Sequence, residues 1–230
     1  MLLLFVIGIS QVSAQDNVRV KCRQFTMNVT SDNVKCYQTL ENSSLPIDAS
    51  DEDVANAQVA NTALYFTDFE NIKSPIAPQV TFYLVDDLGK TSFTFLNAVM
   101  NLTDITNNLN SGYMTSDSID IEIPFLPYQT AARTVSVLPQ KVDFNGGSGI
   151  RTIVSFSDQI SANASSSNLY YSWQGINERG NYYISAVFPL RSTVLDGKSA
   201  GDVDWGTYDG QELQPSLNRL DFYIRSIVIE

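Results

Sequence analysis

The sequence contains no histidine, only two cysteines, and 14 lysine and arginine residues against 25 aspartate and glutamate residues. The lack of histidine removes the commonest general base, the commonest transition-metal ligand and the usual partner of a serine or cysteine nucleophile. Two cysteines cannot complete a tetrahedral zinc site. The net charge of −11 and the scattered basic residues argue against nucleic-acid binding and against an anionic membrane surface.

The sequence also lacks the usual motifs of serine nucleophiles and phosphate loops. Asn145-Gly-Gly-Ser-Gly149 is followed by a strand-like run, whereas a phosphate loop opens a helix. Ile150 occupies the position of the last glycine of a nucleophile elbow, and no serine stands three residues before a lysine. The pattern therefore predicts a hairpin turn at these glycines.

Apolar runs of membrane-spanning length are missing too. The apolar run at residues 1–9 is too short, because a spanning helix needs about 20 apolar residues. Val12-Ser13-Ala14 follows it with the small-residue spacing of a signal-peptidase site, although no lysine or arginine precedes the run. We expect a signal peptide over residues 1–14, one secreted domain over 15–230 and a secreted, periplasmic or cell-envelope location. The alternative is a buried N-terminal strand or helix.

The two cysteines, Cys22 and Cys36, lie close together in the expected mature chain. In an oxidising compartment, the simplest interpretation is one disulfide closing a short loop, worth about 3 kcal/mol in the chain-entropy model. Two free thiols are the alternative. The spacing is not Cys-x-x-Cys, which argues against a redox site.

Hydrophobic periodicity predicts mostly strands, with one helix in the middle of the chain and one at its end. Alternation or apolar runs indicate strands at 18–29, 78–85, 119–123, 134–138, 140–144, 150–156, 169–174 and 182–188. Three-to-four spacing predicts helices over 92–109 and after Pro215, and a short helical turn is expected near 51–60. The predicted fold is α+β, a predominantly antiparallel sheet with both long helices packed on one of its faces.

Two groups of residues could form binding sites. Tyr170, Trp173 and Tyr182 belong to an aromatic hairpin, and Trp205 and Tyr208 follow in an acidic loop. An exposed aromatic strip would bind a partner or a sugar, whereas buried rings would be core. In the same acidic loop, Asp202, Asp204 and Asp209 have the spacing of calcium-binding carboxylates, although the EF-hand pattern fails and a solvated loop is the alternative. No other cofactor is predicted.

Four segments resemble a group of uncharacterised exported bacterial proteins. They are Ile123-Pro-Phe-Leu-Pro127, Phe144-Asn-Gly-Gly-Ser-Gly-Ile-Arg151, Asn168-Leu-Tyr-Tyr-Ser-Trp-Gln-Gly175 and Gly180-Asn-Tyr-Tyr-Ile-Ser-Ala-Val-Phe-Pro189. The resemblance implies export but no activity. The order of strands, hairpin and terminal helix is also loosely similar to the PsbP group, which is an analogy of fold alone.

These observations predict an exported, non-catalytic protein that binds a protein or glycan partner, or a cell-envelope component, through its sheet or its aromatic hairpin. One alternative is a carboxylate-dependent glycan hydrolase, for which acids such as Asp86, Asp87, Asp117, Asp120, Glu122 and Asp143 offer many pairs. The other is a calcium-stabilised extracellular module.

Overall fold

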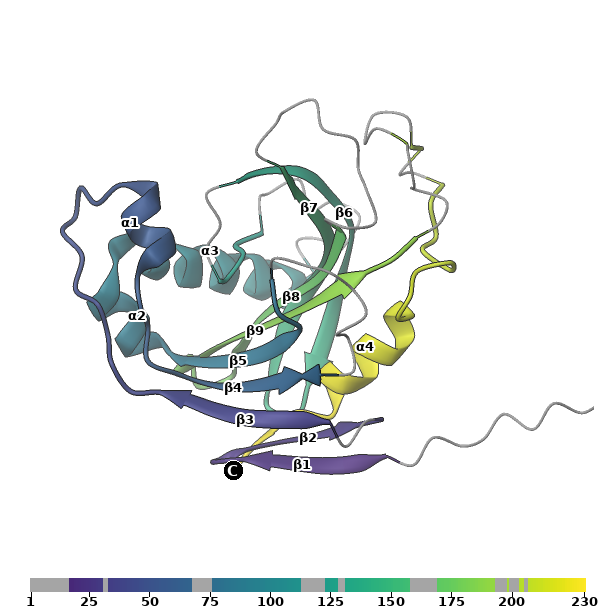
Figure 1. The fold of residues 1–230 in the computed structure, drawn as a ribbon, viewed down its shortest axis with the longest axis horizontal. Helices are drawn as coiled ribbons and strands as arrows, with labels where there is room; N and C mark the ends of the chain where they lie inside the picture. The colour runs from purple at the N-terminus through teal and green to yellow at the C-terminus, as the bar shows by residue number, and fades with distance from the viewer. Residues whose placement is uncertain are drawn as a thin grey trace, which may run out of the picture.

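The computed structural model shows an α+β fold dominated by antiparallel sheet, which confirms the predicted fold class (Figure 1). The structure describes residues 17–30, 33–67, 76–112, 123–127, 131–157, 169–192, 198, 203–204 and 207–230. The predicted signal peptide at residues 1–14 and most of the strand predicted at 119–123 lie outside these ranges.

The larger sheet has seven antiparallel strands in the order β3-β4-β5-β9-β8-β7-β6. The strands are β3 (Val34–Thr39), β4 (Asn61–Phe66), β5 (Gln79–Leu84), β6 (Ala132–Phe144), β7 (Gly147–Ser157), β8 (Leu169–Asn177) and β9 (Tyr182–Leu190). In the register of the central strands, Trp173 lies between Arg151 of β7 and Ala186 of β9. Every residue of β8 is buried, because this strand lies inside the sheet and both of its faces are covered.

The helices are α1 (Asp51–Asn56), α2 (Val85–Thr91), α3 (Phe93–Asn110) and α4 (Leu217–Arg225), so both predicted long helices are confirmed. Serine side chains cap the two long ones: Ser92 accepts from the backbone N–H of Thr94, and Ser216 accepts from that of Arg219. Within the part of the chain that the structure describes, no helix is long and apolar enough to cross a membrane.

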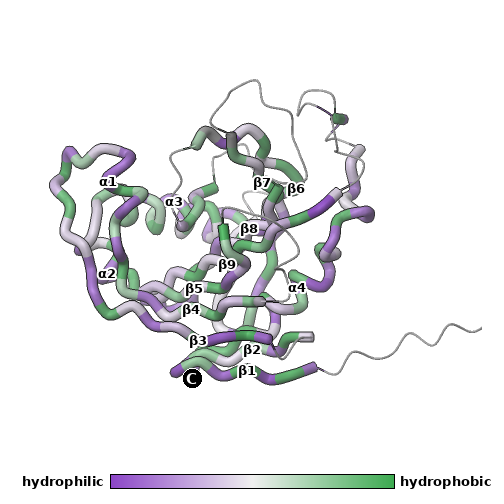
Figure 2. Tube along the Cα trace, viewed as in Figure 1, coloured by the Kyte–Doolittle hydropathy of each residue, from purple (hydrophilic) through white to green (hydrophobic). Residues whose placement is uncertain are grey.

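The two long helices cover opposite faces of the larger sheet, not one face as the sequence predicts. Buried residues of α3 pack with Ile150 and Tyr183, whereas buried residues of α4 pack with Tyr171 and Trp173. Successive strand residues point to opposite faces, so a strand that is buried at every position, as β8 is, has cover on both sides. Figure 2 shows hydrophobic and hydrophilic residues following each other closely along the strands.

The smaller sheet contains β1 (Val18–Cys22), β2 (Phe25–Val29) and β10 (Val228–Ile229) in the order β1-β2-β10. The single strand predicted at 18–29 is wrong, because a hairpin turn divides it. Arg23 adopts φ 59 in that turn. Glycine is the residue that usually signals a positive φ, and its absence here explains why the sequence did not predict the turn. The smaller sheet packs on the α4 face of the larger one, with the rings of Phe25 and Phe82 stacked at 3.9 Å between centroids.

Cys22 and Cys36 lie at disulfide distance, with 5.6 Å between their Cα atoms. The pair joins the end of β1 to β3, and therefore joins the two sheets. The predicted pairing of Cys22 with Cys36 is therefore confirmed as a pair at disulfide distance.

Three further expectations differ from the structure. Helix α2, which directly follows the strand predicted at 78–85, was not predicted, and the strands expected at 134–138 and 140–144 form one irregular strand, β6. Strands β3 and β4 were not predicted, because exposed polar residues interrupt the apolar pattern of β3 and threonine and asparagine begin β4. These two strands provide part of the site described below.

Candidate functional site

Two of the five aromatic residues predicted to bind a partner are core residues. Tyr170 and Trp173 are 1% and 0% exposed, so neither ring offers a surface to a ligand. Tyr182 is half-buried, packs edge-on against Phe25 and accepts a hydrogen bond from the side chain of Gln24 at 2.9 Å. Tyr208 is half-buried, and Trp205 lies outside the described residues. The interpretation of the hairpin as core therefore fits the structure better than the interpretation as a binding strip.

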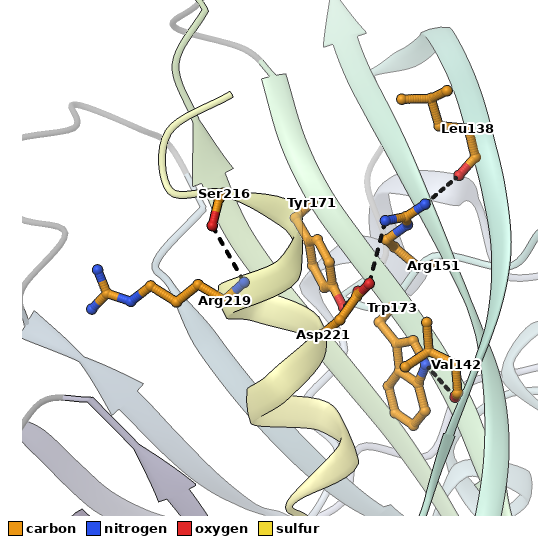
Figure 3. A network of polar contacts seen from close by, with 8 residues as sticks. All are labelled: Leu138, Val142, Arg151, Tyr171, Trp173, Ser216, Arg219 and Asp221. Atoms are coloured by element: carbon orange, nitrogen blue, oxygen red, sulfur yellow. Dashed lines mark hydrogen bonds and ion pairs between the residues drawn. The ribbon is translucent and has the colours of Figure 1, made fainter. Parts of the chain in front are cut away.

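Glycines of the resemblance segments make room for Trp173. A Cβ atom at Gly175 would lie 2.1 Å from the indole, and one at Gly149 would lie 2.6 Å from it. The indole N–H donates to the backbone oxygen of Val142 at 3.1 Å (Figure 3). These glycines are therefore packing residues, and the expected hairpin turn is formed at Asn145-Gly146 between β6 and β7.

A buried polar network joins α4 to the larger sheet. The guanidinium of Arg151 lies 3.4 Å from the carboxylate of Asp221, and the hydroxyl of Tyr171 donates to the same carboxylate at 2.9 Å (Figure 3). Burial raises the pKa of Asp221, while Arg151 and Tyr171 act in the opposite direction. Burial and the neighbouring Asp221 also raise the pKa of Tyr171. The network lies beneath α4, so we assign it to stability.

The structure describes two of the three acids of the calcium hypothesis, which stays a prediction. Asp204 and Asp209 are exposed, and Asp209 accepts a hydrogen bond from the backbone N–H of Gln211 at 3.1 Å. Asp202 lies outside the described residues. Among the residues that are described, no group of three or more acids or cysteines could hold a metal ion.

A pocket of about 230 Å³ lies on the α3 face of the sheet, over β3, β4 and β5. We call it the tyrosine pocket. Helix α1 and the segment after it form one wall, and Leu126 and Pro127 form part of another. The described lining residues are Thr39, Val54, Ala55, Ala57, Gln58, Val59, Asn61, Tyr65, Gln79, Thr81, Tyr83, Leu88, Phe95, Leu126 and Pro127. None of these carries a charge.

Tyr65 and Tyr83 line this pocket, and Tyr37 packs beside Tyr65 outside the lining. Tyr37 of β3 is 53% exposed and packs edge-on against Tyr65 of β4, with 5.2 Å between ring centroids. Tyr83 of β5 is buried at the inner end. Burial raises the pKa of Tyr65, with Tyr37 adding to the effect, and burial also raises the pKa of Tyr83, with Tyr65 adding to it. Both hydroxyls therefore stay protonated and can donate hydrogen bonds at neutral pH.

Polar groups with spare hydrogen-bonding capacity face an apolar base. The side-chain nitrogen of Asn61 donates to the backbone of Val59, and the side-chain oxygen of Gln79 accepts from Thr81. The opposite end of each amide, and the hydroxyl of Tyr65, have no hydrogen-bond partner among the described residues. The pocket thus combines an apolar base with a few polar groups, the usual composition of a small-molecule site.

Sequence reasoning missed this site, because it depends on three strands of which only β5 was predicted. One pattern could have found it: Asn61, Ala63 and Tyr65 alternate with Thr62 and Leu64, as in a strand with one face toward a pocket. Placing Tyr37 and Tyr83 beside Tyr65 requires the strand order, which no local pattern contains.

A second hollow, of about 520 Å³, lies between α3 and the ends of the β6–β7 and β8–β9 hairpins. Two acids line it, Asp143 of β6 and Glu178 of the β8–β9 turn. The carboxylate of Asp143 lies 2.9 Å from the ammonium group of Lys141. The glycan-hydrolase alternative needs two acids in one hollow, and Asp143 and Glu178 are the two described acids that line this one.

No family model, curated protein or solved structure matches the chain. The resemblance to exported bacterial proteins therefore stays a prediction, and the function must be argued from the two hollows.

Proposed function

We propose that this chain is an exported, non-catalytic binding protein that holds a small neutral ligand in the tyrosine pocket. The observation that carries the proposal is a concave, uncharged site in which Tyr65, Asn61 and Gln79 present unused polar groups above an apolar base. Hydrogen bonds from an uncharged lining can offset the free-energy cost of desolvating a neutral polar group, but not the larger cost of desolvating an ion.

The size of the pocket limits the ligand. Its volume of about 230 Å³ lies below the range of about 300–1,000 Å³ that is usual for drug-sized ligands. We therefore propose an uncharged aromatic or short aliphatic group with one or two hydrogen-bonding atoms, either free or as the end of a larger cell-envelope molecule.

Export is proposed on separate grounds. The leader-like pattern at residues 1–14 is a sequence observation, and Cys22 and Cys36 lie at disulfide distance. Disulfides persist mainly in oxidising compartments outside the cytoplasm.

Titration with indole and with benzyl alcohol, followed by ¹H–¹⁵N NMR, tests the pocket. Shifts are expected at Gln58, Asn61 and Tyr65. Tyr65→Phe removes one hydrogen-bonding hydroxyl and should weaken binding of benzyl alcohol about fivefold, which corresponds to about 1 kcal/mol. Tyr37→Phe is the matched control, because Tyr37 lies outside the lining.

A filling variant completes the experiment. Ala55→Leu places a larger side chain in the pocket and should abolish the shifts, whereas Asn56→Leu, on the same helix but outside the lining, should retain them. Shifts scattered over the surface, or unchanged in Ala55→Leu, contradict the proposal.

The glycan-hydrolase alternative rests on Asp143 and Glu178, which line one hollow. Asp143 is already paired with Lys141, whereas glycoside hydrolysis needs two carboxyl groups that act on the substrate. The arrangement therefore favours binding over hydrolysis.

A further inference from the structure

The hollow between α3 and the hairpin ends has the character of a second ligand site, which we call the polar cleft. Helix α3 contributes Thr103, Thr106, Asn107 and Asn110; β6 and β7 contribute Lys141, Asp143, Phe144, Gly147 and Ser148; and β8 with its turn contributes Ile176, Asn177, Glu178 and Gly180. Its volume of about 520 Å³ falls within the usual range of about 300–1,000 Å³ for ligand sites.

Four side chains of the polar cleft have hydrogen-bonding groups that no described residue uses. Asn107, Asn110 and Glu178 are exposed and Ser148 is half-buried, and for none of them does a side-chain hydrogen bond exist within the described ranges. They come from three separate elements, so the fold brings them together around one hollow. Two amides, a hydroxyl and a carboxylate supply both donors and acceptors.

Other polar residues of the cleft are already committed to the fold. The hydroxyls of Thr103 and Thr106 donate to helix backbone oxygens, at 2.7 and 2.9 Å. The side chain of Asn177 accepts from the backbone of Asn181 and Tyr182, which closes the β8–β9 turn. These bonded residues maintain the shape of the hollow, whereas Asn107, Asn110, Ser148 and Glu178 are available to bind a ligand.

Charge and surface point to a neutral, hydroxyl-rich ligand. Lys141 pairs with Asp143, and Glu178 leaves the lining with a net negative charge, which disfavours anions. Phe144 and Ile176 form a small, mostly buried apolar floor. The amide groups of Asn107 and Asn110 and the carboxylate of Glu178 can hydrogen-bond to neighbouring hydroxyls of a sugar.

We propose that the polar cleft binds a neutral oligosaccharide. The site is distinct from the tyrosine pocket, and its occupation does not depend on the function proposed above. Because each hydrogen bond exchanges with water for a small net gain, we expect weak binding, in the millimolar to high micromolar range.

Titration of the ¹⁵N-labelled full chain with chitotetraose, cellotetraose and maltotetraose tests the proposal. At least one sugar should shift the amide signals of Asn107, Asn110, Ser148 and Glu178 at millimolar concentration. Asn107→Ala and Asn110→Ala should each weaken that binding about fivefold, and the double variant by more than tenfold.

Asn108→Ala is the matched control, because Asn108 lies on the same helix, is exposed and does not line the cleft. It makes the same change in helix propensity and should bind like the wild type. Ala55→Leu, which fills the tyrosine pocket, should also leave oligosaccharide binding unchanged, so the two proposals can fail separately.

Three results overturn the proposal: no shifts with any of the sugars, shifts only outside the cleft, or equal binding by Asn107→Ala/Asn110→Ala and Asn108→Ala. Release of shorter sugars during the titration supports the oligosaccharide site and refutes the non-catalytic part of the proposed function. Glu178→Gln should bind the oligosaccharide within about threefold of the wild-type affinity, because the amide that replaces the carboxylate keeps one acceptor.

Discussion

Replacement of Arg151 by methionine should destabilise the protein strongly, and in a pH-dependent way. Arg151 and Asp221 are both nearly buried, with side-chain exposures of 9% and 3%, and their charged groups lie 3.4 Å apart. Arg151→Met leaves the carboxylate of Asp221 beneath α4 without its cation. Removal of one partner from a buried ion pair typically costs about 3–5 kcal/mol. For a chain of this size, the same loss lowers Tm by roughly 6–20 °C.

The pH dependence follows from the pKa of Asp221. Burial raises this pKa and Arg151 opposes the rise, so Arg151→Met should raise it further. A carboxyl group whose pKa is raised in the folded state contributes stability that is present below its unfolded pKa. That contribution is lost as the pH rises through the folded pKa. The deficit of Arg151→Met should therefore be smallest in acid, where Asp221 is protonated in both states, and largest at neutral pH.

Urea unfolding of the wild type and the variants between pH 4 and 8 measures the effect. Arg151→Met/Asp221→Asn should recover most of the loss, because the asparagine is neutral and can still accept from Tyr171. Lys90→Met is the control, since Lys90 pairs with Asp87 but its side chain is 68% exposed. An exposed pair contributes about 0–1 kcal/mol. The reasoning is refuted if the Arg151→Met deficit is independent of pH, or if the double variant is no more stable than Arg151→Met.

Two further predictions concern covalent and steric constraints. Cys22→Ser/Cys36→Ser should lower the free energy of unfolding by about 3 kcal/mol, because the cysteines have a sequence separation of 14 and the unfolded chain regains the entropy of that loop. An unchanged urea midpoint contradicts this prediction. Gly175→Ala should destabilise by at least about 1–3 kcal/mol, since its Cβ would lie 2.1 Å from Trp173, whereas Gly89→Ala in α2 meets only an ordinary contact at 3.7 Å and should stabilise by up to about 1 kcal/mol. Equal Tm shifts for the two glycine variants would show that the packing argument is wrong.

The long helices and the central strands could be predicted because their information is local. Phe95, Val99, Leu102 and Ile105 recur every three or four residues behind a serine cap, and they form the buried side of α3. The apolar runs of β8 and β9 are equally clear. The cysteine pair could also be predicted, since Cys22 and Cys36 are close in the sequence and no third cysteine competes with them.

The role of the aromatic hairpin could not be predicted in the same way. Tyr171 and Trp173 alternate with Tyr170 along β8 and therefore lie on the opposite face of the sheet from it. The structure buries both faces: residues of α4 pack with Tyr171 and Trp173, whereas Tyr170 packs with Ile76 and Phe125. Alternation shows that two faces exist, but only the packing of distant elements decides whether either is exposed.

The sequence by itself determined the fold class, the two long helices, the central strands and the lack of histidine-based chemistry, since each depends on composition or on neighbours within a few residues. Tertiary structure alone decided that Trp173 is core, that Arg151 meets Asp221, and that Tyr65 and Tyr83 line one pocket. These outcomes depend on contacts between residues far apart in the chain. Strand order and helix placement bring such residues together, and neither can be predicted from local hydrophobic periodicity.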